Sequence, residues 1–331
     1  MNNEFKYSLR GMSLEGSLDN SICNNYITES IWQAIFLWKG SYRNDIIGNT
    51  VTNNYDYGIH LQSSYNNISL NNLKDNSAGI VVLASHNMVS KNLVVNNHNS
   101  DGITIHGSFN IINANNITDN KERGIIIEEG SNNIITKNTI ADNDIGFYPF
   151  GVKNNTVILN NFINNGVNAE GSISSTIWDD GTLGNYWSDY KGFDRYGDGI
   201  GDQPKTIESD ANHDNCPLMV PYGANTSIRI TTPLDNYLYL RDVRLMSFPW
   251  SFVFGNIKIT ASVANYENED VEVEKIEFYV DGLHRWTDNK APFGWRWRLS
   301  SHIKHSHTVK VLAYDNVGNI VNDEIKVWRF L

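Results

Sequence analysis

Cysteine is almost absent from this sequence, with only Cys23 and Cys216 in 331 residues. Two cysteines so far apart support neither a disulfide framework nor a cysteine-based metal cluster. No apolar run reaches membrane-spanning length, and residues 1–16 lack the apolar core of a signal peptide. Apolar spacing of three and four residues is never sustained, which disfavours a helical solenoid.

Basic charge is scarce in the first two thirds of the chain. Residues 1–225 hold 24 acidic and 13 basic residues, whereas residues 226–331 hold 13 of each. Residues 170–215 alone hold 10 acidic and 3 basic residues. Nucleic acid is excluded as a partner, because phosphate binding needs a basic surface. The concentrated acid favours a bound cation instead.

Asparagine, in contrast, is abundant and regularly spaced. Six segments carry three asparagines at intervals of five residues, and the triplets recur every 21 to 23 residues. The triplets are Asn44-Asn49-Asn54, Asn66-Asn71-Asn76, Asn87-Asn92-Asn97, Asn110-Asn115-Asn120, Asn133-Asn138-Asn143 and Asn155-Asn160-Asn165. Such a repeat means that one supersecondary unit is stacked many times.

Each repeat holds three short alternating apolar segments. Apolar residues follow the first two asparagines by two positions, and a small residue before an apolar pair completes the repeat, as in Gly102–Ile105. Three short strands in ~22 residues are typical of one coil of a parallel β-helix. We expect asparagine to occupy the left-handed corners and to hydrogen-bond from coil to coil. The sequence therefore predicts an all-β protein that begins with seven to eight coils over residues 1–222.

An acidic, aromatic segment over about 177–220 is predicted to cap the open end of these coils. Within it, Asp194, Asp198 and Asp202 fall at positions 1, 5 and 9 of a calcium-type loop, where Ile200 offers its carbonyl. Tyr196 and Lys205 stand where two further ligands are expected. Two readings stay open: a structural calcium ion, with Asp189 or Glu208 as substitute ligands, or a turn that holds no ion.

The cap also carries a family resemblance. Coils followed by GNYWSDY (184–190), DRYGDGIGD (194–202), Asp214 and Pro217-Leu218 resemble the NosD-like right-handed β-helix proteins, within the carbohydrate-binding and sugar-hydrolase β-helices. The resemblance covers roughly residues 10–220. It implies a right-handed helix in an exported protein, extracellular or at the cell surface, or periplasmic in a cell with two membranes. Because the first coil begins almost at residue 1, we expect an N-terminally truncated chain.

Residues 226–331 change in character. About seven short alternating segments, separated by turns such as Asp281-Gly282, predict a β-sandwich. The stretches KIEFYVDG (275–282) and VLAYDNVGN (311–319) resemble bacterial immunoglobulin-like domains, which are usually spacers.

In each repeat, one predicted strand follows the small residue. The outward-facing side chains of this strand are aligned from coil to coil. Aromatic faces stack on sugar rings, and polar groups fix hydroxyls. The predicted substrate-binding residues are Trp38, His60, Gln62, His106, Glu128, Tyr148 and Phe150. The alternative is that another segment covers this face.

Support for catalysis is weaker. A glycosidase needs two carboxylates at a defined separation, and the candidates Glu128, Glu129 and Asp101 do not recur on adjacent coils. Whether the protein is an enzyme stays open; if so, we expect a polysaccharide hydrolase or lyase.

The leading hypothesis is a monomeric, exported β-helix protein that binds a polysaccharide or cell-envelope glycan, with an immunoglobulin-like spacer. One alternative is a structural or adhesive envelope module without a ligand. A second is a periplasmic accessory role in copper-enzyme maturation, which the family name implies.

Overall fold

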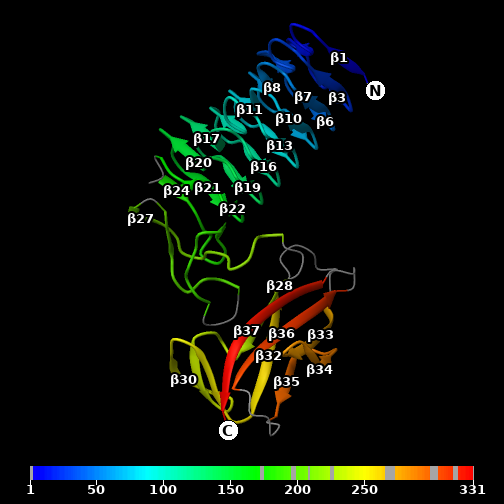
Figure 1. The fold of residues 1–331 in the computed structure, drawn as a ribbon. Coiled ribbons are helices and arrows are strands. Elements are labelled where there is room, and N and C mark those ends of the chain that lie inside the picture. Colours follow the sequence, from blue (N-terminus) through cyan, green and yellow to red (C-terminus); the bar gives the residue numbers. More distant parts are fainter. Residues whose placement is uncertain are drawn as a thin grey trace. The chain divides into compact units, whose positions relative to one another are not determined.

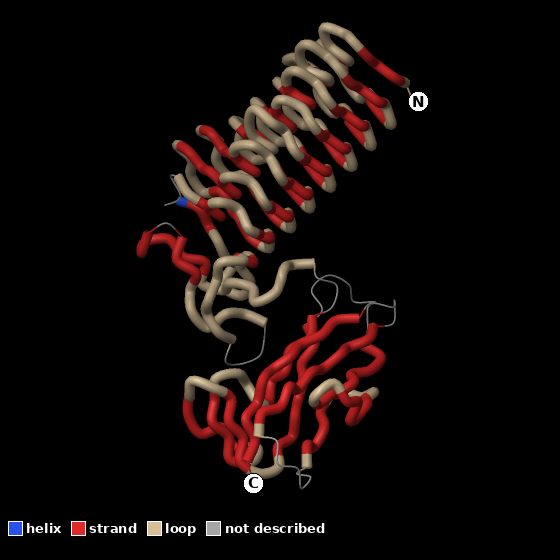
Figure 2. The backbone as a smooth tube through the Cα atoms, in the orientation of Figure 1, coloured by secondary structure: helices blue, strands red, loops and turns tan. Residues whose placement is uncertain are grey.

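The computed structural model describes residues 3–171, 175–194, 199–207, 209–223, 227–264, 273–298, 305–315 and 320–330. The chain divides into two compact units, Met1–Asp194 with Ile200–Tyr222, and Arg195–Gly199 with Gly223–Leu331. Strands dominate both units (Figures 1 and 2). In the described ranges, no helix has the length and apolar character needed to cross a bilayer.

The first unit is a parallel β-helix, as the sequence predicted. Its strands form three parallel sheets, each of which takes one strand from every coil (Figure 1). Sheet A contains β1 (Glu4–Lys6), β4 (Tyr26–Thr28), β7 (Thr50–Thr52), β10 (Asn72–Lys74), β13 (Leu93–Val95), β16 (Asn116–Thr118), β19 (Thr139–Ala141), β22 (Asn161–Ile163) and β25 (Tyr186–Trp187). Sheet B contains β2 (Met12–Leu14), β5 (Ile35–Leu37), β8 (Tyr57–Leu61), β11 (Ala78–Val82), β14 (Ile103–Ile105), β17 (Arg123–Glu128), β20 (Ile145–Phe150) and β23 (Val167–Ala169). Sheet C contains β3 (Ser21–Cys23), β6 (Asp45–Ile47), β9 (Asn67–Ser69), β12 (Met88–Ser90), β15 (Ile111–Asn113), β18 (Ile134–Thr136), β21 (Asn155–Ile158) and β24 (Thr176–Ile177).

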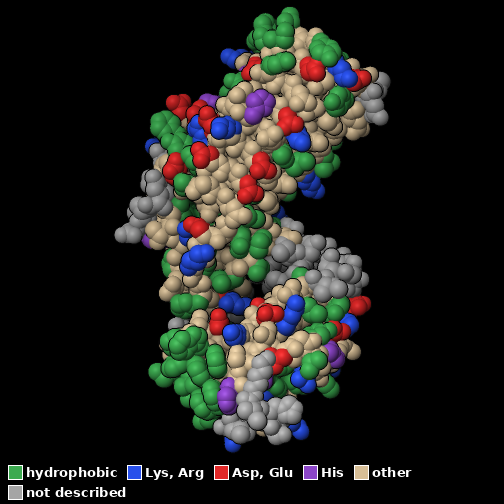
Figure 3. Space-filling view, in the orientation of Figure 1, with side chains coloured by type: hydrophobic (Ala, Val, Ile, Leu, Met, Phe, Trp, Pro, Cys, Tyr) green, Lys and Arg blue, Asp and Glu red, His purple; other side chains and the backbone are tan. Residues whose placement is uncertain are grey.

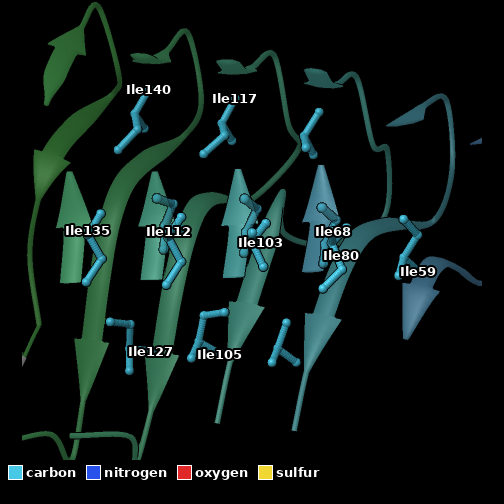
Figure 4. Packing of buried hydrophobic residues seen from close by; sticks show 14 of the residues in the cluster. Ile59, Ile68, Ile80, Ile103, Ile105, Ile112, Ile117, Ile127, Ile135 and Ile140 are labelled. Carbon is cyan, nitrogen blue, oxygen red and sulfur yellow. The ribbon is translucent and has the colours of Figure 1, made fainter. Parts of the chain in front are cut away.

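Columns of aliphatic side chains fill the interior of the coils. Ile103 of β14 pairs with Ile80 on one side and Ile125 on the other, and all three are buried. Figure 4 shows the same stacking for Ile112 and Ile135. Burying one such side chain contributes about 1.5–3 kcal/mol, so the repeated apolar positions hold the coils in register.

The asparagines form continuous ladders, as predicted. The middle ladder consists of the second asparagine of each triplet and runs from Asn49 to Asn185. Each side-chain NH2 group in it donates to the side-chain oxygen of the asparagine one coil further on, at 2.9–3.1 Å. The same oxygen accepts the preceding asparagine's backbone N–H, as Asn115 does from Asn92 at 2.9 Å. These buried amides therefore satisfy the backbone groups that the corners leave unpaired.

The prediction of asparagine at left-handed corners is confirmed at Asn53 and Asn96 (φ 55° and 52°), but the ladder asparagines are not the corner residues. The left-handed corner residue is the one before the ladder asparagine, as at Leu70 (φ 58°), His86 (φ 59°) and Lys91 (φ 55°). The ladder asparagine itself turns inward, because its amide must reach both neighbouring coils. The glycine column has a steric cause: a Cβ on Gly102 would lie 2.7 Å from the carbonyl oxygen of Gly124.

An aromatic cap closes the far end of the coils. Trp187 stacks on Phe162 with ring centroids 4.4 Å apart, and Trp178 packs edge-on against Phe147. The buried carboxylate of Asp214 accepts hydrogen bonds from the Trp187 indole at 2.8 Å and from the Asn185 backbone at 2.6 Å. Burial raises the pKa of Asp214 to about 6. Next to the cap lies the hairpin of β26 (Lys205–Ile207) and β27 (Ser209–Asp214).

The second unit is the immunoglobulin-like domain that the sequence predicted, built from two sheets. The smaller sheet contains β28 (Ser227–Thr232), β32 (Ile257–Ala264) and β35 (Gly294–Trp297). The larger, in spatial order, contains β30 (Val243–Ser247), β29 (Tyr237–Leu240), β31 (Ser251–Phe254), β37 (Ile320–Phe330), β36 (Ser306–Asp315), β33 (Val273–Val280) and β34 (Leu283–Asp288). Its core includes Phe278, Val309 and Trp297.

Candidate functional site

The outward side chains of sheet B form the candidate site, here named the sheet B face. Parallel pairing in register aligns Phe36 with His60 and Val81, and Thr104 with Ile126 and Tyr148. A second column lies two residues further along each strand, at Trp38, Gln62, Leu83, His106, Glu128 and Phe150. Six strands spaced by ~4.8 Å give the face a length of roughly 24 Å. An extended polymer is the shape of ligand that suits such a surface.

The first column is less exposed than the sequence suggested. Phe36, His60, Val81 and Ile126 are buried, although they point away from the helix interior. Flanking side chains on the same face cover them. Trp38, Gln62, Tyr148 and the His106–Glu128 pair are half-buried, and Phe150 is exposed.

An arginine surrounded by aromatic rings marks the N-terminal end of this face. The Arg10 guanidinium lies 5.0, 4.9 and 5.4 Å from the ring centroids of Trp32, Phe36 and Trp38. It also donates to the side chain of Gln33 at 3.0 Å. Sequence reasoning missed Arg10 and Trp32. Aligning the residue directly before the small residue of each coil would have placed Arg10 beside Gln33.

His60 is buried without a hydrogen-bond partner. Only 8% of the residue is exposed, and neither ring nitrogen has a partner. The Phe36 and Tyr57 rings lie 4.8 and 5.2 Å from the imidazole. Burial, followed by the nearby charge of Arg10, lowers the pKa of His60 to about 4. The imidazole is therefore neutral at pH 7, with one donor and one acceptor unused.

Two polar groups occupy the middle of the face. His106 contacts Glu128 on the next coil at 3.1 Å, and both side chains are a little over one third exposed. At the N-terminal ends of the same strands, Arg123 forms an ion pair with Asp101 at 2.9 Å. The Arg123 guanidinium lies 5.3 Å from the Tyr148 ring centroid. Burial raises the pKa of Asp101, against the opposing effect of Arg123.

The candidate catalytic carboxylates are not arranged as a glycosidase pair. Asp101 and His106 lie five positions apart along one extended segment, and Glu128 is aligned with His106. Five residues of extended chain span roughly 16 Å, beyond the ~5–9.5 Å between glycosidase carboxyl groups. Glu129 sits in a left-handed corner (φ 61°) and is exposed. Asp101 and Glu128 therefore lie at opposite ends of the strands of this face.

The predicted calcium loop is only partly described. Asp198 lies outside the described residues, as do Tyr196 and Glu208. Asp194 is buried, and Ile200 forms a bridge with Leu218. Asp189, a suggested substitute ligand, is bonded by Lys205 at 2.7 Å and by Asn168 at 2.8 Å. Those contacts occupy Asp189, so the ion site stays a prediction that depends on Asp194, Asp198, Asp202 and the Ile200 carbonyl.

Comparisons with known proteins agree with this architecture. Residues 2–192 match a family model described as periplasmic copper-binding protein (NosD), and residues 251–311 match one described as bacterial Ig domain. No curated protein matches the chain.

Three solved structures show similarity. The fibronectin(III)-like modules of Clostridium thermocellum CbhA share 22% identity at a TM-score of 0.22, over 31% of this chain and 94% of that one. A mutant of the periplasmic alginate epimerase AlgG shares 23% identity at a TM-score of 0.39. The match covers 44% of this chain and 38% of that one. The enzymatically active domain of bacteriophage CBA120 tailspike protein 2 shares 10% identity at a TM-score of 0.44. The match covers 93% of this chain and 52% of that one.

The description of the matching family model names copper. Copper in proteins is held by clustered imidazole, thiolate and thioether ligands. Among the described residues no group of three or more His, Cys, Asp or Glu side chains is placed to hold a metal ion. His86, moreover, is stacked between Tyr65 and Phe109 on the outer corner of the coils.

Proposed function

Because the chain belongs to the NosD family through residues 2–192, we propose that its β-helix is a binding module of an exported protein. The ligand is a polysaccharide that lies along the sheet B face, parallel to the coil axis. The immunoglobulin-like domain acts as a spacer. The location is the cell surface, or the periplasm of a cell with two membranes.

The unpartnered His60 is the observation that carries this proposal. Leaving a buried polar group without a hydrogen bond costs about 1–3 kcal/mol, and such groups are rare in native structures. A phenylalanine would fill the same space between Phe36 and Tyr57 without this cost. A sugar hydroxyl would supply the missing partner once the side chains that cover His60 move aside.

The surroundings of His60 suit an uncharged sugar chain. Trp38 and Tyr148 place half-buried aromatic rings on the face, and Gln62 and His106 place half-buried hydrogen-bonding groups there. The first 225 residues carry a net charge of −11 (13 basic less 24 acidic), and Arg123 is already bonded to Asp101 and Glu122. Both features disfavour a polyanion.

Glycan-array binding of the whole chain tests the proposal. Trp38→Ala and His106→Ala should each weaken binding about tenfold, since removing a stacked ring or a hydrogen-bonding group costs about 1–2 kcal/mol. Met88→Ala is the matched control, because Met88 is exposed on sheet C, away from this face.

Three other experimental outcomes would each support one alternative function. Absence of binding to every glycan would leave a structural or adhesive envelope module. Copper retained through dialysis would support the accessory role in copper-enzyme maturation. Cleavage of a bound glycan, lost in Glu128→Gln, would make the protein a hydrolase or lyase.

A further inference from the structure

An exposed apolar surface lies at one edge of the immunoglobulin-like domain. Every residue from 240 to 250 is exposed, and seven of these eleven are apolar. Figure 3 shows hydrophobic side chains gathered over this region, around β30. The exposed large apolar residues are Leu240 (53%), Val243 (61%), Leu245 (54%), Met246 (58%), Phe248 (37%), Trp250 (61%) and, beyond the run, Phe254 (39%).

The surface continues onto the neighbouring strands. Phe252 and Phe254 of β31 lie beside Trp328 and Phe330 of β37, with ring centroids 5.5–6.3 Å apart. The Phe248 and Trp250 rings pack edge-on against Phe252. These residues, together with the seven above, are named the β30 surface.

We propose that the β30 surface binds the same surface of a second copy of this chain, which makes the protein a homodimer. This proposal is independent of glycan binding and differs from the monomer expected from the sequence. Seven side chains about half exposed supply on the order of 600 Å², at the upper end for a monomer's largest apolar patch. With the neighbouring rings, this approaches the roughly 800 Å² per partner of a stable complex.

Charge on the surface favours a second copy over a membrane. Residues 235–254 contain Asp235, Arg241, Asp242 and Arg244, so their net charge is zero. Asp242 is bonded to Arg296 at 2.7 Å, and Arg244 lies over the Tyr237 ring. Two copies would not repel each other, whereas binding to anionic lipid needs an excess of Lys and Arg.

The composition also argues against a sugar ligand. Leu240, Val243, Leu245 and Met246 are aliphatic and present neither rings nor hydrogen-bonding groups. Aromatic residues with Met and Arg are enriched in protein–protein interfaces, and Lys and Glu are depleted. Neither Lys nor Glu occurs in residues 235–254.

The contact is made by the sheet face, because the edge of the sheet is irregular. The pairing of β29 with β30 shifts register between Leu238 and Tyr239. A bulge of this kind discourages edge-to-edge strand pairing. A two-fold axis through the face would bring each β30 surface against its equivalent, as in most closed dimers.

Sedimentation equilibrium of the full chain at 1–100 μM tests the proposal. Wild type should double in mass over this range. Met246→Lys combined with Trp250→Ser should raise the dissociation constant at least tenfold. Trp286→Ser is the matched control, because Trp286 is 50% exposed on β34 at the opposite edge of the same sheet.

Circular dichroism should show the same fold in all three proteins, because the substituted side chains are exposed. A wild type that stays monomeric up to 100 μM would overturn the proposal, as would an equal loss in the double variant and the control. Flotation of a monomeric wild type with anionic phosphatidylglycerol vesicles would replace the second copy with a lipid surface.

Discussion

Asparagine acts in this protein mainly through its side-chain amide. Asn115 is buried; its amide donates to Asn138 at 2.9 Å and to the Val89 carbonyl at 2.9 Å, and its oxygen accepts from Asn92. Each ladder residue thus joins three coils. The preceding corner residue is more variable: Asn and Asp are frequent there, as at Asn53 and Asp75, but Leu70, Lys91 and Ala114 adopt the same left-handed conformation.

Asn115→Ala is expected to lower the free energy of unfolding by about 2–4 kcal/mol, since several buried groups lose their partners at once. Urea unfolding followed by circular dichroism measures this change. The neighbouring Asn116 is exposed on β16, so Asn116→Ala should change stability by less than about 0.5 kcal/mol. Equal effects from the two substitutions would contradict the role of the ladder.

His60 makes stability depend on pH. Its pKa is lowered from 6.5 to about 4 in the folded protein, so the unfolded chain binds a proton more readily. The free energy of unfolding should therefore fall as pH falls from 6.5 to 4, by at most about 3 kcal/mol. His60→Phe should remove this loss, as measured by urea unfolding at several pH values.

The substitution also separates stability from binding. His60→Phe should be as stable as wild type at pH 7 or more so, yet bind glycan more weakly. His86→Phe is the control, because His86 is exposed whereas His60 is buried. A variant that loses stability at pH 7 would show that His60 is a packing residue.

Among the elements of the structure, the cap combines buried aromatic rings with the hydrogen bonds of a buried carboxylate. Its aromatic part was predicted from the sequence, and Trp178 and Trp187 indeed close the core. The way in which the cap is fastened was not predictable. Asp214 meets Asn185 and Trp187 only because β27 folds back onto the last coil.

Calcium binding by the loop from Asp194 to Asp202, next to the cap, remains a prediction. If the loop binds calcium near saturation, EGTA should lower the melting temperature by roughly 5 °C. Differential scanning calorimetry measures the shift, and Asp202→Asn should abolish it. A melting temperature that is the same with EGTA and with added calcium would reject the ion.

At the scale of the whole molecule, the chain separates two kinds of surface. The β-helix unit carries the acidic charge and the sheet B face, while the immunoglobulin-like unit is electrically balanced and carries the β30 surface. Binding of an extended ligand and self-association are therefore assigned to different units. Substitutions on one surface should leave the other function intact.

The repeat, the strands, the ladders and the nature of both units could be predicted from residue spacing alone. Local spacing is enough for these, because each coil contacts mainly its neighbours and every neighbour has the same pattern. The folded chain was needed to show which outward side chains are buried, that His60 lacks a partner, and which carboxylate fastens the cap. Those properties depend on contacts between coils and with the returning β27 strand, and no spacing within one repeat encodes them.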